Sequence, residues 1–133
     1  MRTETFELDT RDQRVIDVTE RVQRFVPPGS DGLLNVFVPH ATAGVAVIET
    51  GSGSEQDLED ALERLLPRDD RYRHGHGSTG HGGDHVMPAF IAPSVVLPVI
   101  DGSIALGTWQ WIVVVDPNYD NDVRTVRLSF IAS

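Results

Sequence analysis

Residues 33–49 read Leu-Leu-Asn-Val-Phe-Val-Pro-His-Ala-Thr-Ala-Gly-Val-Ala-Val-Ile-Glu. Their apolar and β-branched side chains predict two buried strands, over residues 33–39 and 44–48. The two strands either pair with each other or bend apart at Ala41–Gly44, and the pattern fits both arrangements. Each predicted strand is followed by a titratable residue, His40 after the first and Glu49 after the second.

Further strands are predicted on both sides of this pair. Residues 3–8 alternate between polar and apolar side chains, as in a half-buried strand, and residues 124–131 close the chain as another. Residues 104–115 form one long strand candidate, with a β-bulge expected at Gly107-Thr108. Asp101-Gly102, just before it, is a dipeptide typical of a tight hairpin.

Two helices are predicted between the strands. The clearer one has apolar residues at helical spacing, with Ser54 as the expected N-cap and Pro67 as its end. Those apolar residues are Leu58, Ala61, Leu62, Leu65 and Leu66. A shorter helix is expected to end at Val26, where a Pro-Pro-Gly sequence follows. We therefore expect a single domain, residues 1–133, of the α+β class with sheet predominating.

The composition excludes several functional classes. A net charge of −9 and an isoelectric point near 4.8 argue against nucleic acid as a partner, because phosphate binding needs a basic surface. The absence of lysine excludes Schiff-base chemistry, and the absence of cysteine excludes disulfides, thiolate ligands and cysteine nucleophiles. No apolar run is long enough to span a membrane, and the N-terminus lacks an apolar signal core. We therefore expect a cytoplasmic protein without a membrane partner.

Four of the five histidines lie within residues 72–85, which read Tyr-Arg-His-Gly-His-Gly-Ser-Thr-Gly-His-Gly-Gly-Asp-His. This segment has no apolar face, and nothing in it predicts a helix or a strand. Imidazole is the commonest protein ligand for zinc and similar ions, so the cluster of His74, His76, His81 and His85 indicates a metal site. The alternative is a flexible, solvated loop.

Several residues have a functional and a structural interpretation. A zinc site needs three or four ligands, so His40 and the four loop histidines are too many. An isolated His40 would simply bond the backbone at a strand end. Glu49 is either a general base near His40 or a solvated strand end. Asp84 either orients a neighbouring imidazole or caps a turn. Arg124 and Arg127, on the closing strand, either face solvent or bind a substrate phosphate.

Short motifs distributed along the chain form a recognisable set. They are His40-Ala-Thr-Ala-Gly44 with Ile48-Glu49, then Tyr72-Arg-His74, Asp84-His85, and Gly102-x-x-Ala-Leu-Gly-Thr-Trp-Gln110. Together these motifs resemble the YjbQ-like family, whose members are known as secondary thiamine-phosphate synthases. The string Leu106-Gly-Thr-Trp-Gln110 is the most specific marker, and the resemblance extends over residues 5–133.

The resemblance implies a β-sandwich-like α+β fold, assembly as a homotrimer, and a metal site built from histidines. The three histidine positions of the family correspond to His40, His74 and His85, with zinc as the expected divalent ion. The catalytic positions of the family correspond to Glu49, Gln110 and Arg124. Other members often carry Glu and Asn between the second and third histidines, where residues 75–83 are longer and carry His76 and His81 instead.

Three functions are compatible with these residues. The family name implies a transferase that joins hydroxymethylpyrimidine diphosphate to thiazole phosphate, with weak activity, using Arg124 on the pyrophosphate and Glu49 as acid–base. The second function is a metal-dependent hydrolase or lyase on a small, unidentified substrate, in which Glu49 takes a proton from metal-activated water. The third is a non-catalytic metal-binding trimer in which protein fills every coordination position.

Overall fold

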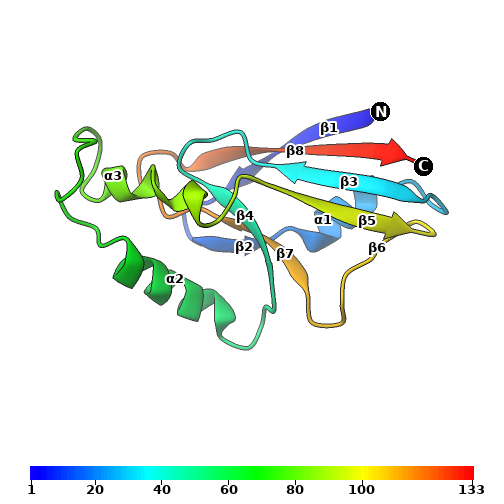
Figure 1. Cartoon of the computed structure of the whole chain (residues 1–133), viewed down its shortest axis with the longest axis horizontal. Helices are drawn as coiled ribbons and strands as arrows, with labels where there is room; N and C mark the ends of the chain where they lie inside the picture. The colour runs from blue at the N-terminus through cyan, green and yellow to red at the C-terminus, as the bar shows by residue number, and fades with distance from the viewer.

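The computed structural model describes residues 1–133 as two antiparallel sheets with helices around them (Figure 1). The larger sheet has the strand order β1-β8-β3-β5-β6, and the smaller has the order β2-β7-β4. The strands are β1 (Arg2–Asp9), β2 (Val15–Asp17), β3 (Gly32–Phe37), β4 (Gly44–Ile48), β5 (Ser94–Ile100), β6 (Ser103–Ile104), β7 (Trp111–Val115) and β8 (Val123–Ala132). The helices are α1 (Thr19–Phe25), α2 (Ser54–Leu65), the single turn α3 (His81–Asp84) and the 3-10 turn η1 (Met87–Ala89).

The main core lies between the two sheets and is closed by α1. From the larger sheet it takes Leu34 and Leu128, from the smaller sheet Ile112 and Val114, and from α1 Phe25, all of them buried. Two sheets that pack face to face bury the alternate side chains of their strands, which is what these residues do. The expected sheet-dominated, sandwich-like α+β fold is confirmed.

The central strand β7 is buried on both faces. Val113 and Val115 point away from the main core into a second cluster, against which Leu58 and Leu62 of α2 pack. A strand covered on both sides is expected to read as a continuous apolar run rather than an alternating one, as Ile112–Val115 does. The predicted helix after Ser54 is confirmed and covers this outer face of the smaller sheet.

The two strands of the opening stretch do not pair with each other. β3 lies between β8 and β5 in the larger sheet, whereas β4 pairs with β7 in the smaller one. The chain therefore bends between residues 38 and 43 and crosses from one sheet to the other. This crossing allows both strands to be buried, because each contributes side chains to the core from its own side.

The single strand predicted over residues 104–115 is wrong. The chain forms β6 and β7 instead, one in each sheet, with a turn between them. Gln110 closes that turn, because its Oε1 accepts a hydrogen bond from Gly107 N at 2.8 Å and its own N–H donates to Gly107 O at 3.1 Å. The hairpin predicted at Asp101-Gly102 is confirmed, with φ angles of 49° and 77° that suit a tight two-residue turn. No helix in the chain combines the length and apolar character needed to cross a membrane.

Candidate metal centre

Four imidazole rings gather where the segment around His74 meets α3. His81 and His85 are four residues apart and lie on one side of this short helix, with ring centroids 4.7 Å apart. The His74 ring lies 4.1 Å from that of His85, and the His76 ring lies 4.0 Å from that of His74. One nitrogen from each of His74, His81 and His85 lies within 4.8 Å of the other two. The expectation that residues 72–85 contain no helix is therefore wrong at α3.

Close packing of glycines against Tyr72 brings the two halves of this segment together. A Cβ atom at Gly82 would lie 2.5 Å from Cβ of Tyr72 and 2.8 Å from the carbonyl oxygen of His74. A Cβ atom at Gly83 would lie 2.8 Å from the Tyr72 hydroxyl, which itself donates to Pro67 O at 2.8 Å. Only glycine permits this approach without a shift of the backbone. The approach places the His74 ring beside those of His81 and His85.

Asp84 anchors α3 from its other side. Its carboxylate is buried and accepts hydrogen bonds from Arg68 Nη1 at 2.5 Å and Nη2 at 3.1 Å, and from Asn118 Nδ2 at 3.0 Å. A single helical turn is too short to be stable alone, so these charge-assisted bonds hold it in place. Asp84 does not hydrogen-bond the neighbouring His85, the role that sequence analysis considered for it.

The partner of the cluster is a second loop, residues 116–120 (Asp-Pro-Asn-Tyr-Asp), which follows β7. Asp120 Oδ2 lies 2.6 Å from His81 Nδ1 and accepts hydrogen bonds from the backbone and hydroxyl of Ser78. Asn118 connects the 116–120 loop to Asp84. In the sequence of this loop, acid and amide side chains alternate at positions 116, 118 and 120.

Two pKa shifts follow from this arrangement. Burial, followed by the neighbouring rings of His74 and His81, lowers the pKa of His85 and favours the neutral imidazole that binds metals. The backbone hydrogen bond from Ser78, followed by the contact with His81, lowers the pKa of Asp120. At neutral pH the site therefore combines a neutral His85 with an ionised Asp120.

Arg124 is held by Asp116 of the same loop and by Thr42. Its Nε and Nη2 bind the two carboxylate oxygens of Asp116 at 2.7 and 2.8 Å, and Nη2 also donates to Thr42 Oγ1 at 2.8 Å. The side chains of Arg124 and Asp116 are 2% and 0% exposed, so this is a buried ion pair rather than a surface one. Arg127, three residues later on β8, is exposed and donates to Thr3 Oγ1.

His40 lies outside the group of converging nitrogens. Its Nε2 accepts a hydrogen bond from Thr125 N at 2.8 Å, so the ring is fastened to β8. Burial, followed by the positive charge of Arg124, lowers the pKa of His40. This is the backbone-bonded arrangement considered for an isolated histidine at a strand end.

Glu49 and Gln110 lie at the opposite end of the smaller sheet. Gly44 pairs with Val115 beside the 116–120 loop, whereas Ile48 pairs with Trp111 at the far end. Four residue steps along β4 separate the two ends, which corresponds to about 13 Å. Glu49 follows Ile48 and is exposed, and Gln110 precedes Trp111 in the turn after β6 (Figure 1). Within one chain, neither side chain belongs to the histidine cluster.

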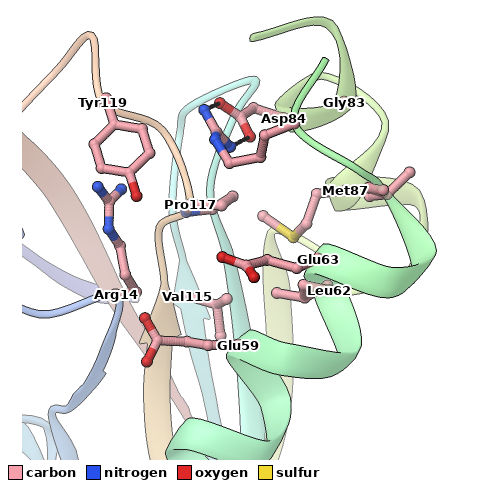
Figure 2. A pocket seen from close by; sticks show the side chains of 12 residues that line it. Arg14, Glu59, Leu62, Glu63, Gly83, Asp84, Met87, Val115, Pro117 and Tyr119 are labelled. Carbon is pink, nitrogen blue, oxygen red and sulfur yellow. Dashed lines mark hydrogen bonds and ion pairs between the residues drawn. The ribbon is translucent and has the colours of Figure 1, made fainter. Parts of the chain in front are cut away.

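Hollows lie on both sides of α3. One is lined by His74, His76 and His81 together with Asp69, Asp70 and Tyr72. The other lies between α2 and the 116–120 loop, and Figure 2 shows Asp84 and Gly83 on its upper side, Arg14 against the ring of Tyr119, and Glu59 and Glu63 projecting from α2. The two hollows share no lining residue. Only the first one opens onto the imidazoles.

Comparisons with known proteins place this fold and sequence among a set of similar chains. The sequence matches the family profile described as "UPF0047 protein YjbQ-like" over residues 4–133. The UPF0047 protein Rv2556c of Mycobacterium tuberculosis is 62% identical over 131 residues, which cover 98% of each chain. A UPF0047 protein of Archaeoglobus fulgidus is 35% identical over 99 residues, covering 74% of this chain and 77% of its own. Among solved structures, the hypothetical protein APE1520 from Aeropyrum pernix K1 superposes with a TM-score of 0.90 at 32% identity, over the whole of both chains.

Proposed function

The chain belongs to the YjbQ-like UPF0047 protein family, and we propose that within it this chain binds a divalent metal ion, zinc, through His74, His81 and His85. The observation that carries the proposal is the convergence of three imidazole nitrogens within 4.8 Å of one another. Ligand nitrogens around tetrahedral zinc lie roughly 3.3 Å apart, so a small inward movement of the rings completes the site. Three protein ligands leave one coordination position for a water molecule or a substrate atom.

The proposed reaction is metal-dependent hydrolysis or elimination on a small substrate. His74, His81 and His85 would hold the ion, and zinc bound there would supply an acidified water and polarise a carbonyl or phosphoryl oxygen. The open hollow over His74, His76 and His81 supports this reaction, because it leaves the cluster accessible from solvent. His76 is the nearest additional imidazole, with its ring centroid 5.0 Å from that of His81, and is our candidate for moving the proton.

The proposed ligand set differs in one position from the set that the resemblance implies. It keeps His74 and His85 and replaces His40 by His81. Two contacts support the replacement, since His40 Nε2 is engaged by Thr125 N whereas His81 Nε2 faces His85 Nε2 at 2.9 Å.

Thiamine-phosphate synthesis finds less support in the geometry. That reaction needs free positive charge for the leaving pyrophosphate, and the guanidinium of Arg124 is buried against Asp116 and Thr42. Glu49 and Gln110, the other two catalytic positions implied by the resemblance, stand at the far end of β4 and β7. For these reasons we place hydrolysis or elimination ahead of the synthase reaction.

We further propose that the chain assembles as a homotrimer through the outer face of the larger sheet. Leu33 and Ile131 pair across β3 and β8, with Val96 on the neighbouring β5, and their exposures are 52%, 57% and 57%. Contiguous apolar side chains on a sheet face usually mark a contact surface. Light scattering of the purified protein is expected to give three times the chain mass, and Leu33→Asp is expected to lower it. A parent protein with the mass of one chain would contradict this assembly.

The test of the metal site is metal analysis of the purified protein followed by zinc titration of the stripped protein. One zinc per chain is expected, and His81→Ala and His85→Ala are expected to abolish stoichiometric binding while His76→Ala retains it. Loss of binding in His76→Ala as well would make His76 a fourth ligand and favour the closed, non-catalytic site. Parent-like binding in both His81→Ala and His85→Ala would rule out the proposed ligands.

The test of the reaction uses the zinc-loaded protein on panels of phosphoesters, lactones and amides. His76→Gln serves as the proton-transfer variant, since it is expected to retain zinc and lose turnover. Formation of thiamine phosphate from hydroxymethylpyrimidine diphosphate and thiazole phosphate is assayed in parallel. Turnover there that exceeds a metal-stripped control would instead support the synthase.

A further inference from the structure

We infer that Asp120 is a positioning residue that fixes His81 as the Nδ1–H tautomer and so directs the Nε2 lone pair of His81 into the ligand position. The inference rests on the proposed metal site. It assigns a role in that site to a residue of the 116–120 loop, which contributes no ligand of its own.

The tautomer follows from the contact between the two side chains. His81 Nδ1 lies 2.6 Å from Asp120 Oδ2, and an ionised carboxylate can only accept a hydrogen bond. Nδ1 therefore carries the proton and donates it, which leaves Nε2 as the unprotonated nitrogen. Asn118 Nδ2, which can only donate, also lies 3.1 Å from Nδ1 and would favour an unprotonated Nδ1, but this contact is longer and uncharged. The charged contact decides the tautomer.

The geometry on the far side of the ring agrees with this assignment. His81 Nε2 faces His85 Nε2 at 2.9 Å, a hydrogen-bond distance at which one nitrogen donates and the other accepts. Because the Nε2 of His81 holds a lone pair, the donor in the metal-free protein is the Nε2–H of His85. The lone pair of His81 therefore points at His85, which belongs with His74 and His81 to the group whose ligand nitrogens lie within 4.8 Å of one another.

Asp120 is itself held firmly enough to direct the ring. The backbone N–H and the hydroxyl of Ser78 both donate to Asp120 Oδ2, each at 3.1 Å. The backbone N–H of Asp120 donates to Asn118 Oδ1 at 2.9 Å, and Asn118 Nδ2 donates to the buried carboxylate of Asp84. The 116–120 loop is thus tied to both halves of the histidine segment before any ion binds.

The arrangement is one that metal sites use repeatedly. A carboxylate that accepts the second ring N–H of a histidine ligand fixes the orientation of the ring and raises the basicity of the ligating nitrogen. Asp84, the acid next to a ligand in the sequence, cannot act in this way because Arg68 and Asn118 occupy it. Asp120, thirty-nine residues away from His81 in the chain, takes that place.

The primary test reads the tautomer directly in the metal-free protein. In a long-range ¹H–¹⁵N spectrum of the histidine rings at neutral pH, parent His81 is expected to show a protonated Nδ1 and an unprotonated Nε2. Asp120→Ala is expected to lose this pattern and show the tautomer mixture of a free imidazole. Asp120→Asn keeps an acceptor oxygen, and His81 in this variant is expected to remain mostly protonated at Nδ1. Asp122→Asn, a change at an exposed acid two residues later, is the matched control and is expected to match the parent.

The second readout is zinc affinity measured by chelator competition. Asp120→Ala is expected to weaken zinc binding by roughly 10–100-fold, with Asp120→Asn intermediate and Asp122→Asn unchanged. A parent spectrum with His81 protonated at Nε2, or an Asp120→Ala variant with parent tautomer and parent affinity, would overturn the inference. A parent with the expected tautomer but no zinc binding would overturn the proposed function instead, because the tautomer is read without metal.

Discussion

Two polar clusters lie on either side of the 116–120 loop and use its side chains in opposite ways. In the first, Asp116 binds Nε and Nη2 of Arg124, and the same Nη2 also donates to Thr42. In the second, Asp120 binds one nitrogen of His81, and the other nitrogen faces another imidazole rather than a carboxylate or the backbone. The first cluster is closed and buried, whereas the second opens onto a hollow.

This contrast between a buried ion pair and accessible imidazoles separates structural from functional polar residues in this protein. A buried ion pair in which the guanidinium binds both carboxylate oxygens has little capacity left for a ligand, so its expected role is to hold β8 against the smaller sheet. A group of imidazoles that converge on one point offers ring nitrogens to a cation, an arrangement that adds little to stability and suits metal binding. Residue type alone does not distinguish the two clusters, because both contain residues common in active sites.

The largest expected effect is the loss of stability when the buried Arg124–Asp116 ion pair is broken. Arg124→Ala leaves the buried carboxylate of Asp116 without its partner, and we expect it to lower the free energy of unfolding by about 3–5 kcal/mol. Equilibrium urea unfolding of the metal-free protein measures this loss. Arg127→Ala, at an exposed position of the same strand, is the control and is expected to stay within about 0.5 kcal/mol of the parent. Equal effects in the two variants would refute the contrast between the clusters.

Substitutions in the histidine cluster are expected to change zinc affinity strongly and the free energy of unfolding only slightly. His81→Ala and His85→Ala are each expected to weaken zinc binding by more than about 100-fold, while the unfolding free energy of the metal-free protein changes by less than about 1 kcal/mol. Isothermal titration with zinc and urea unfolding give the two quantities on the same samples. His40→Ala is the informative comparison, since parent-like zinc affinity is expected there. A loss of affinity equal to that of His81→Ala would restore His40 to the ligand set.

A smaller effect is expected from His40 as the pH changes. Its pKa is lowered in the folded protein by burial and by Arg124, so the unfolded chain binds a proton more readily than the folded one. The contribution of His40 to stability is therefore complete above the ordinary histidine pKa of about 6.5 and is lost as the pH falls from there towards the lower folded value. Urea unfolding at a series of pH values is expected to show a shallower acid-side loss in His40→Gln than in the parent. An unchanged slope would mean that His40 titrates alike in both states.

The smallest expected effect is at Glu49. Because it lies at the other end of β4, Glu49→Gln is expected to leave the zinc affinity of the stripped protein within about twofold of the parent. Chelator competition measures this directly. If turnover of a substrate were lost while zinc affinity stayed constant, Glu49 would belong to the reaction in the assembled protein through another copy of the chain.

Much of the fold was predictable from local patterns. The alternating residues 3–8, the helix after Ser54 and the Asp101-Gly102 hairpin were predicted from side-chain period and turn chemistry, which act over a few residues. The long strand expected at 104–115 was not correct, because an apolar run does not reveal which sheet each half joins. That choice depends on Gln110 closing a turn and on two layers sharing a core.

The candidate site was predictable only in part. The spacing of His74, His76, His81 and His85 in the sequence indicates a histidine cluster, and the acidic composition argues against nucleic acid as a partner. The partners of that cluster were not predictable, since Asp120 lies 39 residues beyond His81, with β5, β6 and β7 between them in the chain. The alternation of acid and amide residues at 116, 118 and 120 was the one local signal available, and it is also common in solvated loops.

The sequence by itself determined which residue types could do chemistry here: imidazoles and carboxylates, with no thiol and no lysine. It also determined the elements whose residues are close along the chain, because periodicity and turn preferences are local properties. Only the tertiary structure decided that Arg124 forms a buried ion pair with Asp116 and that His81 Nδ1 contacts the carboxylate of Asp120. The physical reason is that the hydrogen-bond partners of a polar side chain are its neighbours in space. Those neighbours come from strands and loops that are far apart in the sequence.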